Sequence, residues 1–88
     1  MMVEYRGRKY RHQQMWSLVA ALSADGWYVR FGAMPESGPW AQVRRYKEVD
    51  GIATLVESYL RRGSALDLTP FNALVLAIEQ LKRSHKEE

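Results

Sequence analysis

The sequence contains no cysteine, so neither a disulfide framework nor a thiolate metal site is possible. This absence fits a reducing compartment, and we expect a cytoplasmic protein. Long hydrophobic runs are missing as well: the longest covers residues 73–78, far short of the ~20 apolar residues that a spanning helix needs. The basic N-terminus is not followed by a continuous apolar segment, so a signal peptide is not predicted. We therefore expect no membrane association.

Residues that carry out chemistry are few and scattered. The only histidines, His12 and His85, are far apart in the sequence, and neither has a second metal ligand one helical turn away. The serines lack the strand-turn-helix context of a nucleophile, and the glycine-containing loop over residues 33–39 precedes a strand rather than a phosphate-binding helix end. We predict a non-enzymatic protein without catalytic residues, metal, cofactor or small-molecule ligand.

The composition instead predicts one small domain over residues 1–88. Apolar residues make up 47% of the chain and aromatic residues 11%, which is enough for a packed core. Residues 1–47 contain eight Lys or Arg against three Asp or Glu, a net charge of +5, whereas residues 48–88 contain five against seven, a net charge of −2. The basic first half favours an anionic partner, so nucleic acid is one candidate.

The first eleven residues read as a tight hairpin. Residues 6–7, Arg-Gly, suit a two-residue turn, because glycine accepts the positive φ that such turns need. This turn would pair Glu4 with Lys9 and Val3 with Tyr10, which are favourable pairs across an antiparallel ladder. The alternative is a basic arm that leads directly into the first helix.

That helix is predicted over residues 12–24, where Met15, Leu18, Val19 and Leu22 recur at helical spacing and Gly26 follows the end. Two strands then alternate apolar and polar residues. Pairing Val29 with Val43 and Phe31 with Ala41 keeps the apolar faces together, and the same register sets Gly32 against Trp40 and Tyr28 against Arg44. Tyr28 and Arg44 are then within reach of a cation–π contact.

Two further helices are predicted in the second half. Asp50 is a good N-cap, Ile52, Leu55, Val56, Tyr59 and Leu60 lie at helical spacing, and Gly63 follows as a stop. Thr69-Pro70 begins the last helix. This last helix is apolar around more than half of its circumference, so it is either central or shared with a partner. Residues 84–88 are charged and expected to fray.

Together these elements predict an α+β fold: a small two-layer domain with an antiparallel sheet of two β-hairpins and three helices, in the order ββ-α-ββ-α-α. The expected core comprises Leu18, Leu22, Trp27, Val29, Phe31, Val43, Leu55, Tyr59, Leu74 and Ile78.

The candidate functional site is the opposite face of the central strands, where aromatic, arginine and glutamine side chains alternate with the core residues. A basic extension is expected if the first hairpin joins the same sheet. The candidate residues are Tyr28, Arg30, Trp40, Gln42, Arg44 and Tyr46, with Arg8, Lys9 and Arg11 as the extension.

Such a face has two interpretations. Tyrosine, tryptophan and arginine are enriched at protein–protein interfaces, including those between identical chains. The same residue types bind single-stranded nucleic acid by stacking and charge. We rank a protein interface, including self-association, ahead of nucleic acid, and both ahead of catalysis.

Overall fold

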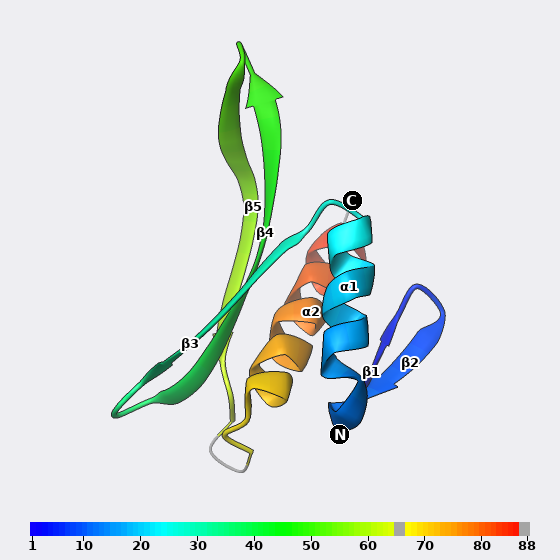
Figure 1. Ribbon diagram of the computed structural model, residues 1–88, viewed down its shortest axis with the longest axis vertical. Helices are drawn as coiled ribbons and strands as arrows, with labels where there is room; N and C mark the ends of the chain where they lie inside the picture. The colour runs from blue at the N-terminus through cyan, green and yellow to red at the C-terminus, as the bar shows by residue number, and fades with distance from the viewer. Residues whose placement is uncertain (65–66, 87–88) are drawn as a thin grey trace.

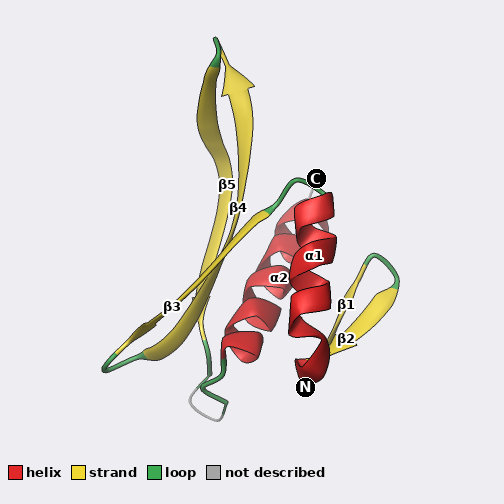
Figure 2. Ribbon diagram, viewed as in Figure 1, coloured by secondary structure: helices red, strands yellow, loops and turns green. Residues whose placement is uncertain are grey.

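The computed structural model describes residues 1–64 and 67–86 as an α+β fold with two antiparallel sheets and two α-helices (Figures 1 and 2). The elements in chain order are β1 (Met2–Tyr5), β2 (Arg8–Arg11), the short 3₁₀ helix η1 (His12–Gln14), α1 (Met15–Ala24), β3 (Tyr28–Met34), β4 (Gly38–Val49), β5 (Ile52–Arg62) and α2 (Pro70–Lys86).

The N-terminal hairpin is confirmed, and so is its register. Arg6 and Gly7 both have positive φ, +52° and +79°, as a two-residue hairpin turn requires. Glu4 pairs with Lys9 and Val3 with Tyr10. The hairpin forms a sheet of its own, however, on the other side of the helices from the three-stranded sheet (Figure 2). The helices therefore lie between two sheets, and the predicted two-layer arrangement is wrong.

Polar contacts fasten this hairpin to both helices. The Tyr5 hydroxyl donates a hydrogen bond to the Asp25 carboxylate at the end of α1, and the Arg6 guanidinium lies 2.7 Å from the same carboxylate. Burial of the Tyr5 ring raises the pKa of its hydroxyl, and the hydrogen bond to Asp25 raises that pKa further. The Lys82 ammonium of α2 donates to the Glu4 carbonyl at 2.8 Å.

The β3–β4 register is the predicted one. Val29 pairs with Val43, Phe31 with Ala41, and Gly32 with Trp40. The strands are longer than expected, since β3 runs to Met34 and β4 begins at Gly38; the predicted loop over residues 33–39 shortens to a turn over residues 35–37.

The predicted second helix is wrong, because residues 52–62 form strand β5, paired antiparallel with β4. Asp50 is not an N-cap. It forms a turn with Gly51, and their φ values of +52° and +77° are those of a two-residue hairpin connection that pairs Val49 with Ile52. The turn directs the chain back along β4 as a third strand.

Because residues 52–62 form a strand and not a helix, Leu55 is not in the core as predicted: its exposed fraction is 49%. Seven of the ten predicted core residues are buried, and Val29 and Phe31 are partly buried against them.

The last helix is confirmed and is central. The Thr69 hydroxyl accepts a hydrogen bond from the Asn72 backbone N–H at 3.1 Å, which caps the first turn of α2. α2 packs on β4 and β5, and its buried residues occupy most of its circumference. The helix continues to Lys86, so the expected fraying of residues 84–86 is wrong, and residues 87–88 lie outside the described part of the chain.

A matched pair of substitutions tests the corrected topology. Leu74 on α2 is fully buried, so Leu74→Ala should lower the free energy of unfolding by about 2–5 kcal/mol. Leu55→Ala removes the same atoms from an exposed strand position and should change that free energy by less than about 0.5 kcal/mol. Urea denaturation at low protein concentration measures both, and equal losses would support the helical assignment of residues 52–62.

Candidate interaction surface

The six candidate residues of the central strands lie on one face of the three-stranded sheet. Alternate residues of β4, Ala41 and Val43, are buried beneath the helices, so the residues between them point the other way. The ladder places Tyr28 beside Arg44 and Arg30 beside Gln42. We call this side of the sheet the outer face. Its predicted members are Tyr28, Arg30, Trp40, Gln42, Arg44 and Tyr46.

Aromatic rings and an arginine pack together at the centre of the outer face. The Tyr28 and Tyr46 rings meet edge to face, with centroids 5.3 Å apart. The Arg44 guanidinium lies over the Tyr46 ring, 5.4 Å from its centroid, rather than over the ring of Tyr28, its partner in the ladder. These contacts hold the three side chains in fixed positions, which reduces the conformational entropy that a partner would have to remove.

Trp40 lies against the adjacent strand. A Cβ atom added to Gly32 would be 2.2 Å from Cζ2 of Trp40, so only glycine leaves room for the ring. The ring covers a position of β3 that has no side chain, as the register predicts.

Strand β5 adds residues that the sequence analysis did not place on this face. Leu60 pairs with Gln42, and Leu55 with Tyr46, which puts both leucines on the outer face, where they are 56% and 49% exposed. The Gln42 amide also donates a hydrogen bond to the Ser58 hydroxyl at 2.9 Å. The Asp-Gly pair between Val49 and Ile52 is typical of a hairpin turn, and it is the sequence signal that would have identified strand β5 and its outer-face residues.

A hollow lies at the end of the outer face nearest the β3–β4 turn. It has a volume of about 540 Å³ and is lined by Met34, Trp40, Gln42, Leu60, Arg61 and Arg62. Apolar side chains with a guanidinium at the edge suit an apolar group accompanied by a negative charge.

The basic extension does not belong to the outer face. Arg8, Lys9 and Arg11 lie on β2, in the separate N-terminal sheet, and the Arg8 guanidinium lies over the Tyr10 ring of its own strand. The condition for the extension, that the first hairpin joins the same sheet, is therefore not met.

A second group of polar side chains joins the end of α2 to the helix-facing side of the sheet. Glu57 of β5 lies 2.7 Å from the His85 imidazole, accepts a hydrogen bond from the Tyr59 hydroxyl at 2.8 Å, and is 3.8 Å from the Arg45 guanidinium. The Arg45 guanidinium also lies over the Trp27 ring, 4.0 Å from its centroid. The sequence analysis missed this group because it placed His85 in a frayed tail.

Burial by itself would raise the pKa of Glu57, but the hydrogen bonds from His85 and Tyr59, and the charges of His85 and Arg45, together lower it. We interpret the group as a structural link between α2 and the sheet, because His85 of α2 and Arg45 and Tyr59 of the sheet all contact the one Glu57 carboxylate.

Within residues 1–64 and 67–86, no group of three or more His, Asp or Glu side chains lies where it could hold a metal ion. In the same part of the chain, neither helix is long and apolar enough to cross a membrane. Comparisons with protein-family models, curated proteins and solved structures found no match.

The Glu57 carboxylate predicts a specific acid sensitivity. A pKa that is lower in the folded state than in the unfolded chain stabilises the fold above the unfolded value, ordinarily near 4.5, and this stabilisation is lost as the pH falls through the folded value. In Glu57→Gln, the melting temperature should therefore fall less between pH 6 and pH 3 than in the wild type. Thermal melts across this range measure it; parallel curves would show that Glu57 does not contribute.

Proposed function

We propose that this protein is a non-enzymatic binding module that docks another protein chain, which includes a second copy of itself, on the outer face of its sheet. The observation that carries the proposal is the contrast between the two faces of one sheet. On the helix-facing side Ala41 and Val43 are fully buried, whereas Tyr28, Met34 and Leu60 on the outer face are each more than half exposed. Large apolar side chains gathered on one exposed face are typical of interaction sites.

The kinds of side chain favour a protein partner over nucleic acid. Leu55, Leu60 and Met34 offer aliphatic surface, which packs well against other apolar side chains but provides no ring for base stacking. Two of the rings are already engaged, since the Tyr28 and Tyr46 rings pack edge to face. The Trp40 ring lies against Gly32 with one of its faces.

Nucleic acid is the second candidate, because arginine dominates the charge of the outer face. Arg30, Arg44 and Arg62 lie there, and single-stranded nucleic acid binds to such combinations of arginine and aromatic side chains.

Site-specific photo-crosslinking in cells tests the proposal directly. A benzophenone amino acid at Tyr28, which is 58% exposed on the outer face, should give protein adducts upon irradiation. The matched control is Trp16 on α1, an aromatic residue that is 68% exposed outside the outer face, and the same substitution there should give few adducts. The proposal would be overturned if Tyr28 gave no adducts, gave no more than Trp16, or gave adducts that nuclease digestion removes.

An oligonucleotide titration separates the two partners by mechanism. For a protein-binding face, Trp40→Ala should leave the affinity for short single strands unchanged at both low and high salt. A reduction of roughly 1–3 kcal/mol at either salt concentration would instead show that bases stack on Trp40. Filter binding with wild type and variant measures this difference.

A further inference from the structure

The far end of the β4–β5 hairpin extends beyond the helices. We define the arm as residues 46–56, which comprise the end of β4, the Asp50–Gly51 turn and the start of β5 (Figure 1). All its residues from 47 to 56 are exposed, and four of them are large and apolar: Val49, Ile52, Leu55 and Val56. The ladder places Leu55 on the outer face beside Tyr46, whereas the Val49–Ile52 pair points to the other side of the ribbon. A two-stranded ribbon is at best marginally stable alone in water, so this composition indicates an element that another chain covers.

The charge of the arm is opposite to that of the rest of the outer face. Glu48 and Asp50 outweigh Lys47 in the arm. Among the described strand residues on the remainder of the outer face, the charged ones are Arg30, Arg44 and Arg62. Two copies whose basic parts met directly would place arginines against arginines. An arm laid on the basic part of another copy instead places carboxylates near arginines and apolar groups on apolar groups.

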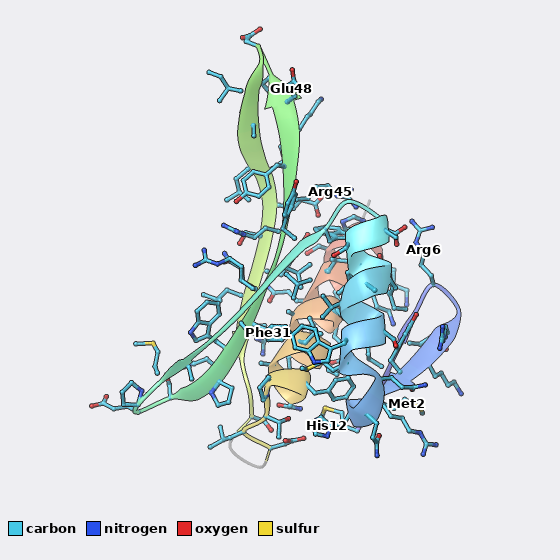
Figure 3. The ribbon with its side chains drawn as sticks, viewed as in Figure 1. Met2, Arg6, His12, Phe31, Arg45 and Glu48 are labelled. Carbon is cyan, nitrogen blue, oxygen red and sulfur yellow. The ribbon has the colours of Figure 1, made fainter. Side chains whose placement is uncertain are left out.

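The register shows that both copies can make this contact at once. Alternation along β4 from Arg44 puts Glu48 on the outer face, and Figure 3 shows it near the end of the arm. Trp40, paired with Arg62, is eight residues back along the same strand, about 27 Å away. Arg44 is midway between Glu48 and Trp40. A two-fold axis that lies in the interface and crosses the strands beside Arg44 would therefore bring Glu48 of each copy to the Trp40–Arg62 pair of the other. Arg44 is then the one outer-face arginine that meets its own copy, and each Arg44 guanidinium lies over the Tyr46 ring of its own chain.

The same axis brings apolar groups together. Leu55 pairs with Tyr46, two residues from Arg44 in one direction, and Leu60 pairs with Gln42, two residues in the other. Leu55 of each copy would then reach Leu60 of the other, at the hollow that Met34, Trp40 and Leu60 line. Two-fold interfaces make every contact twice, which suits a short arm with few side chains.

We propose that a second copy of this chain occupies the outer face, in a reciprocal dimer in which the acidic, apolar arm of each copy lies on the basic, aromatic part of the other. This inference rests on the proposed function, because it names the partner of the same surface.

Charge reversal tests the reciprocal contact. Sedimentation or light scattering over a concentration series should show wild type passing from 10.2 kDa to twice this mass. Glu48→Arg and Arg62→Glu each create two like-charge contacts and should each raise the dimer dissociation constant by at least about tenfold. Glu79→Arg, the same change on an exposed position of α2, should leave the dissociation constant unchanged and is the matched control.

Mixing the two variants is the decisive step. A heterodimer of Glu48→Arg with Arg62→Glu has opposite charges at both contacts, so the mixture should associate more tightly than either variant alone. The double variant should likewise recover the dimer. A wild type that is monomeric at several hundred micromolar, or a mixture no tighter than its components, would overturn the inference.

The two proposals fail separately. If the wild type is monomeric and Tyr28 still crosslinks to a different protein, the outer face remains a docking surface and only the reciprocal dimer is overturned. If Tyr28 gives no protein adducts either, both the docking surface and the reciprocal dimer are overturned.

Discussion

The burial of α2 against one side of β4 and β5 is the contact on which the rest of the structure depends. Leu74 and Ile78 on the helix and Val43 on β4 are fully buried, and Tyr59 on β5 is buried with them. Because side chains alternate along a strand, fixing this side also fixes which residues point away from the helix. The outer face is thus determined by the core: a shift of one residue in β4 would exchange Val43 with Arg44 and bury a guanidinium.

The parts of the fold that the sequence predicted well are those in which two independent patterns agree. In β3 and β4 the alternation of apolar residues and the pairing of Gly32 with Trp40 select the same register. In the N-terminal hairpin the Arg-Gly turn and the Glu4–Lys9 pair agree in the same way. The register of β3 and β4 is therefore the predicted one, and it places the six candidate residues of these strands on one face.

Strand β5 was missed because its pattern is ambiguous. Ile52, Leu55, Val56 and Tyr59 are spaced as on a helix, and an aspartate followed by a glycine begins helices as well as hairpin turns. The ladder between β4 and β5 has a β-bulge, because Arg45 pairs with Glu57 but the next residue, Tyr46, pairs with Leu55. The extra residue on β5 interrupts strict alternation, which is part of the reason for the helical spacing. The link between Glu57 and His85 joins residues 28 positions apart on two different elements, so no local pattern could have shown it. The placement of the first hairpin in a separate sheet is likewise a matter of packing between distant segments.

The bulge between β4 and β5 changes the direction of the two strands and leaves the residue pairs on either side of it intact. Arg45 pairs with Glu57 and Tyr46 with Leu55, so Val56 is the residue without a position in the ladder. Removing Val56 would keep every pair in the same register but straighten and untwist the ribbon at its base. Val56 therefore adds a bend where the hairpin leaves the body of the molecule, and a chain without it would carry the same side chains on a straighter ribbon.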